Sequence, residues 1–192
     1  MVYNSGVMLK LGRKVFTVLW ILVIIYLIIK YLQNPEIIKV DNIKAFVESY
    51  GNEMIFIYIL LTFVRGFFLI PSTPFVIGGS LLFPDQLFLV LMISISGVLF
   101  SATLLYFLAD KLGFSDYFKT KQSKSIEIWK TRLKSPKAIY FVIGWSFFPF
   151  VPTDVICYVA GLVKMPFKYM ITGVFIGELV LDVFYIYFDI IL

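Results

Sequence analysis

Long apolar segments alternate with short charged ones over most of this 192-residue chain. The first apolar segment runs from about Val15 to Ile29 and, with Tyr31 and Leu32, nearly reaches the length of a membrane-spanning helix. Two longer stretches, residues 54–109 and 139–192, are also predominantly apolar. This pattern predicts an all-α integral membrane protein.

Both long stretches are interrupted in the same way. Each interruption has a glycine and, five residues later, the first of two prolines spaced three apart: Gly66, Pro71 and Pro74; Gly144, Pro149 and Pro152. Because proline lacks an N–H donor and disrupts a helix, each pair should break one. Paired interruptions in the two halves of a membrane chain indicate a transport site.

The composition supports the membrane assignment and excludes several classes of function. The chain is 60% hydrophobic and 15% charged, with a mean hydropathy of +0.93, far from the soluble norm. It contains no histidine and only one cysteine, Cys157. Metal sites built on Cys/His clusters and hydrolases with a histidine base are therefore excluded. We expect no enzyme, no cofactor and no metal. The net charge of +5 lies mostly in one loop, so we do not expect a nucleic-acid partner.

Residues 1–50 should form an N-terminal anchor and an interfacial helix. Three basic residues precede the first apolar segment (Lys10, Arg13 and Lys14), and no small-residue cleavage site follows it. We therefore expect an uncleaved anchor with a cytoplasmic N-terminus rather than a signal peptide. Residues 35–50 then place their apolar side chains near one helical face: Ile37, Val40, Ile43, Phe46, Val47 and Tyr50. A short helix lying in the membrane interface fits this pattern.

Residues 51–192 divide into two units, about 51–110 and about 139–192, joined by a basic loop (111–138). Residues 110–138 carry eight Lys/Arg against three Asp/Glu, which places the loop in the cytoplasm. The segment 31–53 has two Lys against four Asp/Glu and should lie outside.

These two placements agree only if residues 54–84 enter and leave on the same side, as a re-entrant hairpin, and 86–109 spans the membrane. The same logic makes 139–166 a re-entrant hairpin and 168–190 a span. We therefore predict two inverted repeats, an architecture of transporters. The alternative is two proline-kinked spanning helices.

A half-helix should begin after each break, capped by Thr73, with Pro74 at the first helical position, and by Thr153 or Asp154. Two such N-termini at the membrane midplane would bind an anion, phosphate especially. The candidate transport residues are those at and beside the breaks: Arg65, Pro71, Ser72, Thr73, Pro74, Ser146, Pro149, Pro152, Thr153 and Asp154.

Arg65, Asp154, Glu178 and Asp182 are the ionisable residues inside the apolar segments. Each is costly at the bilayer centre unless it is paired or faces water, so each is a functional candidate. Glu178 and Asp182 lie four apart on one helical face. Two such carboxylates rarely ionise together in a low dielectric, so we expect this pair to serve in proton coupling. A purely structural role is the alternative, with Asp154 as a helix cap and Arg65 in an ion pair with Glu178 or Asp182.

Two small-x3-small motifs predict close helix packing, Gly97-x3-Ser101 and Gly173-x3-Gly177.

An ordered set of short motifs covers roughly residues 50–190. In the first half these are Arg65-x5-Pro71-x2-Pro74-x3-Gly78-Gly79-x3-Phe83, Gly97-x3-Ser101-x4-Tyr106 and Leu112-Gly113. In the second half they are Phe148-Pro149-Phe150-Val151-Pro152-Thr153-Asp154, Tyr158-Val159-Ala160-Gly161, Pro166-Phe167 and Gly177. This set resembles the DedA/VTT-domain superfamily, which includes SNARE-associated-type bacterial proteins and scramblases of the endoplasmic reticulum.

The resemblance implies two inverted re-entrant hairpins with spanning helices, and movement of phospholipids or polyprenyl phosphates between leaflets, in bacteria often linked to the proton-motive force. The chain departs from the family in two places. It has Ser146 where many members have arginine, and the position after Gly177, often followed by proline in the family, reads Glu178-Leu179.

We therefore expect a lipid flippase or scramblase that acts on a phosphate-bearing lipid such as a phospholipid or polyprenyl phosphate. The alternatives are a proton- or cation-coupled carrier of a small solute and a non-transporting membrane assembly factor. We expect membrane lipids as partners and a bacterial plasma membrane as location, and a homo-oligomer is compatible with the sequence.

Overall fold

The computed structural model describes residues 3–111, 131–148 and 151–188, which are helical and contain no strand. Within these residues, four helical segments are long and apolar enough to cross a membrane: Val15–Gln33, Gly51–Phe68, Pro84–Ala109 and Phe167–Phe188. The prediction of an all-α integral membrane protein is confirmed. The predicted site residue Pro149 and most of the basic loop lie outside the described residues.

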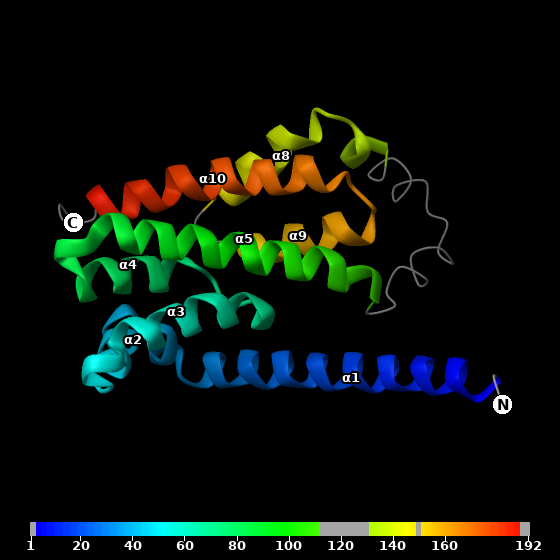
Figure 1. Cartoon of the computed structure of the whole chain (residues 1–192), viewed down its shortest axis with the longest axis horizontal. Coiled ribbons are helices and arrows are strands. Elements are labelled where there is room, and N and C mark those ends of the chain that lie inside the picture. Colours follow the sequence, from blue (N-terminus) through cyan, green and yellow to red (C-terminus); the bar gives the residue numbers. More distant parts are fainter. Residues whose placement is uncertain (1–2, 112–130, 149–150, 189–192) are drawn as a thin grey trace.

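The N-terminal part contains α1 (Tyr3–Gln33), the short 3-10 helix η1 (Pro35–Ile38) and α2 (Val40–Glu48). In Figure 1, α1 runs along one edge of the molecule. The expected interfacial helix is interrupted at Lys39, which has an extended backbone. Of its predicted apolar face, Ile43 and Val47 are buried within the protein, whereas Phe46 and Tyr50 are exposed on its surface. α2 packs against α4.

Each proline break separates two short helices. The first pair is α3 (Met54–Val64), continued by η3 (Arg65–Phe68), and α4 (Thr73–Leu82). The second pair is α8 (Ala138–Ser146) and α9 (Thr153–Leu162). In Figure 1, α3 runs into the molecule and α4 returns, while α8 and α9 do the same from the opposite end. We call these pairs the first and second hairpins, and the turns between their helices, together with the helical residues that flank these turns, the tips.

The structure corrects the predicted caps. The N-cap of α4 is Ser72 and that of α9 is Pro152, each one residue before the first predicted cap. Neither N-cap makes a side-chain capping hydrogen bond. The hydroxyls of Ser72 and Thr153 instead reach a carboxylate on another helix.

The two long helices α5 (Leu87–Lys111) and α10 (Phe167–Phe188) form the centre of the molecule. The short helix η2 (Gly51–Glu53) joins α2 to α3, and η4 (Pro84–Gln86) joins α4 to α5. α5 packs against α3 of its own unit and α9 of the other, whereas α10 packs against α8 of its own unit and α4 of the other. In each unit, therefore, the long helix contacts the first helix of its own hairpin and the second helix of the other hairpin.

Both small-x3-small motifs lie at equivalent contacts, as predicted. A β-carbon at Gly97 would meet Thr62 of α3, and Ser101 lies against Gly66. A β-carbon at Gly173 would meet Val142 of α8, and one at Gly177 would meet Ser146. In each unit the long helix therefore uses small side chains to admit the first helix of its own hairpin.

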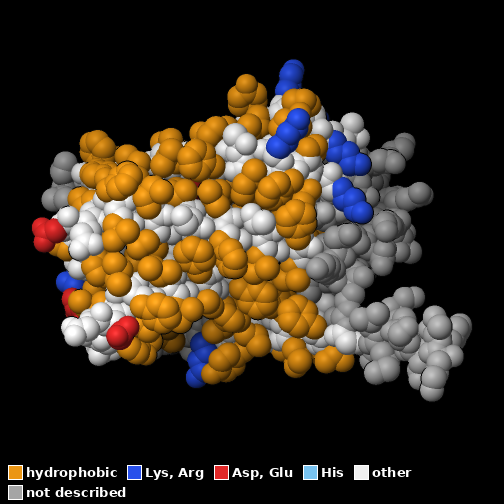
Figure 2. All heavy atoms as spheres, in the orientation of Figure 1, with side chains coloured by type: hydrophobic (Ala, Val, Ile, Leu, Met, Phe, Trp, Pro, Cys, Tyr) orange, Lys and Arg blue, Asp and Glu red, His pale blue; other side chains and the backbone are white. Residues whose placement is uncertain are grey.

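Charge is distributed unevenly over the surface. Figure 2 shows hydrophobic side chains covering the middle of the molecule, most Lys and Arg side chains toward one end and acidic ones at the other. Exposed basic residues include Arg132, Lys134 and Lys137 in the described part of the basic loop, and Lys164 and Lys168 in the second unit. An apolar belt between charged ends is the arrangement that a bilayer requires.

Candidate functional site

The four ionisable residues of the apolar segments are all buried where the two tips meet α10. Arg65 and Asp154 are each 4% exposed, and Glu178 and Asp182 are each 1% exposed. Arg65 belongs to the first hairpin, Asp154 to the second, and the other two to α10. Residues far apart in the sequence thus form one polar cluster inside an apolar protein.

Arg65 pairs with Asp154 rather than with Glu178 or Asp182. Its Nη1 lies 3.6 Å from Asp154 Oδ2 and donates a hydrogen bond of 3.0 Å to the Ile70 carbonyl in the tip. A β-carbon at Gly66 would collide with Ser101 and crowd the Asp154 carboxylate. Glycine at this position therefore allows the two hairpins to approach.

The Glu178 carboxylate connects the two tips. Its Oε1 accepts a hydrogen bond from Thr153 Oγ1, in the first turn of α9. Its Oε2 accepts one of 3.4 Å from Ser72 Oγ, at the N-cap of α4. Because helix N-termini attract negative charge, Glu178 occupies a position that suits an anion. The protein's own carboxylate thus lies where the sequence predicted an external phosphate.

Two buried polar atoms beside this carboxylate have no hydrogen-bond partner. They are Oδ2 of Asp182, one helical turn beyond Glu178, and Oγ of Ser146, at the end of α8. Nε of Arg65 likewise has none. Buried polar atoms without partners are uncommon in proteins and are costly.

A cavity of about 10 Å³ separates the tips. It has room for about one water molecule. Its lining contains six of the ten predicted transport residues, Pro71, Ser72, Thr73, Ser146, Pro152 and Thr153. Glu178, predicted for proton coupling, lines it as well. Pro74 lies in the first turn of α4, where it lines a different groove together with Pro71. The tips are therefore almost closed against each other.

The four buried side chains comprise one base and three acids. If all were ionised, the cluster would carry a charge of −2 in a low dielectric, which is unfavourable. A bound proton or cation would reduce this cost. The described residues contain no group of three or more His, Cys, Asp or Glu side chains that could hold a metal ion.

Sequence analysis missed the role of Trp20. Its indole N–H donates a hydrogen bond of 3.0 Å to the Phe67 carbonyl, and its ring packs against Phe67 and Tyr158. Trp20 thus attaches α1 to both hairpins. A tryptophan within an apolar segment carries no signal that distinguishes this contact from exposure to lipid.

Comparison with known proteins matches the part of the chain that contains most of the site. The VTT domain family model matches residues 70–189. An uncharacterized protein of Methanocaldococcus jannaschii is 34% identical over 110 residues, which are 57% of this chain and 67% of that protein. No solved structure matches the chain. The matched range contains the prolines of both breaks, Glu178 and Asp182, but begins after Arg65.

Proposed function

The chain belongs to the VTT-domain (DedA) family, and on this premise we propose that it is a membrane lipid transporter, a flippase or scramblase. It moves a phosphate-bearing lipid, such as a phospholipid or a polyprenyl phosphate, between the two leaflets. The observation that carries this proposal is the buried polar cluster where both tips meet Glu178.

The headgroup passes between the tips while the lipid tails stay in the bilayer. Arg65 supplies positive charge, and the N-termini of α4 and α9 supply backbone N–H donors for the phosphate oxygens. Ser146, whose hydroxyl is buried without a partner, adds a donor where many family members have arginine. Glu178 must leave the helix N-termini before a phosphate can take its place, because both are anions.

The tips separate during transport. A cavity of about 10 Å³ is far smaller than a phosphate headgroup, so the present arrangement is a closed one. Opening breaks the hydrogen bonds that Glu178 accepts from Ser72 and Thr153 and exposes the Arg65–Asp154 pair. Broken helices suit such a motion, because the tips can move without bending a continuous helix.

A proton couples to this opening through Glu178 and Asp182. A protonated Glu178 is neutral, so its attraction to the two helix N-termini and to Arg65 is weaker. The tips are then released and the site becomes available to phosphate. Asp182, one turn away on the same helix, is the second carboxylate that takes up and releases the proton.

Within the membrane, each hairpin is re-entrant and the N-terminus is cytoplasmic. The fold-back of α3/α4 and of α8/α9 from opposite ends of the molecule supports this arrangement (Figure 1). The excess of exposed basic side chains at one end supports it as well (Figure 2). The units are then inverted repeats with their tips near the midplane.

Lipid movement in liposomes tests the proposal. Purified protein is reconstituted with fluorescent phospholipid and polyprenyl phosphate analogues, and exchange is followed by leaflet-selective quenching with and without a pH gradient. We expect protein-dependent exchange that is lost in Arg65→Gln. Folded protein that moves neither lipid would exclude lipid transport.

The excess of buried carboxylates favours one other candidate, a proton- or cation-coupled carrier of a small solute. Uptake of a water-soluble ion into the same vesicles, without lipid exchange, would establish it. A membrane assembly factor that transports nothing would show neither activity and would tolerate neutral replacement of all four buried charged residues.

A further inference from the structure

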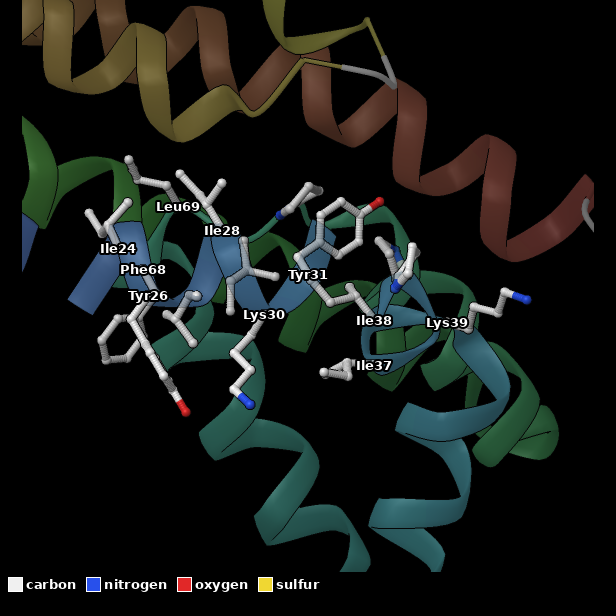
Figure 3. Close-up of a pocket in the computed structure, with 15 residues that line it drawn as sticks. Ile24, Tyr26, Ile28, Lys30, Tyr31, Ile37, Ile38, Lys39, Phe68 and Leu69 are labelled. Atoms are coloured by element: carbon white, nitrogen blue, oxygen red, sulfur yellow. The ribbon is translucent and has the colours of Figure 1, made fainter. Parts of the chain in front are cut away.

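A groove lies between α1, η1 and the tip of the first hairpin. Its volume is about 770 Å³, and it is open to the surface of the molecule. Its lining includes Ile24 and Ile28 of α1, Ile37 of η1, and Phe68 and Pro71 of the first hairpin. Figure 3 shows the lining side chains, which come from three separate segments.

The groove suits an apolar chain. Its lining is largely aliphatic and aromatic, and its volume lies within the range of about 300–1,000 Å³ that is typical of ligand sites. The groove opens beside the apolar surface of α1, where Leu22 and Ile28 are 55% and 52% exposed. In a membrane this surface faces hydrocarbon, so acyl chains have direct access to the groove.

Two lysines at the groove distinguish it from ordinary lipid-facing surface. Lys30 lies in the last turn of α1, and Lys39 follows η1. In Figure 3 both extend away from the apolar side chains. Lys39 pairs with Glu36 at 2.5 Å, and Lys30 makes no salt bridge within the described part of the chain. Lys30 lies over the ring of Tyr26, 5.8 Å from its centroid. Lys30, Lys39 and Glu36 together carry a charge of +1, at the end of a helix where lysines extend to lipid headgroups.

We infer that this groove binds one membrane lipid with an anionic phosphate headgroup. The acyl chain lies along Ile24, Ile28 and Phe68, and the headgroup contacts Lys30 and Lys39. The complementary charge and the apolar walls together select an anionic lipid over a zwitterionic or a soluble ligand. Pro71 and Pro74 form part of the wall, so the bound lipid lies beside the first tip. This binding does not depend on transport and holds even if the protein moves no lipid.

Lipid retention tests the inference directly. The full chain is placed in nanodiscs that contain equal amounts of phosphatidylglycerol and phosphatidylcholine, and retained lipid is identified by native mass spectrometry after release. We expect the wild type to retain phosphatidylglycerol in preference to phosphatidylcholine. Ile28→Trp fills the groove and should lower retained phosphatidylglycerol by about fivefold or more. Leu22→Trp is the matched control, because Leu22 is equally exposed on the same helix but does not line the groove.

A second variant tests the charge separately from the shape. Lys30→Gln should lower the preference for phosphatidylglycerol by about fivefold and leave retention of phosphatidylcholine unchanged. Equal retention in wild type, Ile28→Trp and Leu22→Trp would overturn the inference, as would a wild type that retains both lipids equally or none. Transport assays play no part in this result, so it stands apart from the test of lipid exchange.

Discussion

Arg65 of the first hairpin and Asp154 of the second lie 3.6 Å apart, from Nη1 to Oδ2, in the buried interior. Eighty-nine positions separate them in the chain, yet they form the ion pair that joins the two tips. Because both side chains are buried, water could not stabilise either charge if its partner were removed. The pair therefore contributes to holding the closed arrangement.

Removing one partner of this pair should destabilise the protein. We expect Arg65→Gln or Asp154→Asn to lower the free energy of unfolding by about 3 kcal/mol, because the remaining charge is buried without its partner. The free energy of unfolding should fall less in the double variant than the sum of the two single losses. Denaturant titration in mixed micelles measures all three.

The exposed pair Lys39–Glu36 is the control for this cycle, with both side chains 57% exposed. Lys39→Gln should change stability by no more than about 1 kcal/mol. If Arg65→Gln and Asp154→Asn were no more costly than this control, the pair would not join the tips.

Two glycines of the second unit should respond in opposite directions to the same replacement. Gly177→Ala places a β-carbon against Ser146 and the Ile143 carbonyl, so α10 and α8 must separate, at a cost of about 1–3 kcal/mol. Gly144→Ala in α8 meets nothing within 4 Å and should stabilise that helix by up to about 1 kcal/mol. The same titration compares both. A loss of stability in both variants alike would contradict the packing described for Gly177.

The sequence predicted the all-helical membrane class and the positions of the helix breaks, because each of these features has a local cause. Proline pairs cannot continue a helix, so Pro71 and Pro74 located the first tip. The second break lies where Pro149 and Pro152 predicted it, although Pro149 itself is outside the described residues. The small-x3-small motifs correctly predicted close helix contacts, because only small side chains allow two helices to approach so closely.

The partners within the site were harder to predict. The structural alternative drawn from the sequence paired Arg65 with Glu178 or Asp182, whereas in the structure its partner is Asp154. Which carboxylate faces Arg65 depends on how the hairpins rotate against α10, and spacing along the chain does not contain this information. Ser72 and Thr153 illustrate the same limit. Local rules favour hydroxyls at helix N-termini as caps, but the nearby Glu178 carboxylate is the stronger acceptor.

Neutral replacement of Glu178 should remove the pH dependence of lipid exchange. In the wild type, protonation releases the tips, so exchange should rise as pH falls, by up to about tenfold per pH unit where one proton controls the step. Glu178→Gln resembles the protonated form and should exchange lipid at a rate that does not vary with pH. Stopped-flow quenching of labelled liposomes over a pH series measures this.

Asp85→Asn is the matched control, because Asp85 is an exposed carboxylate in η4, remote from the tips. It should keep the wild-type pH profile. A profile in Glu178→Gln that still follows the wild type would remove Glu178 from the coupling step.

Separation of the tips is the central claim, and a reversible cross-link between them tests it most directly. Thr73 and Ser146 line the same small cavity from opposite hairpins, so both are changed to cysteine in a Cys157→Ala background that has no other thiol. Lipid exchange in liposomes is measured before oxidation, after disulfide formation and after reduction, with single Ser146→Cys as the control. We predict that lipid exchange falls to the protein-free rate when the disulfide forms and returns on reduction. Oxidation should leave lipid exchange by the single-cysteine control unchanged. Undiminished exchange through the disulfide-linked protein would contradict a path between the tips.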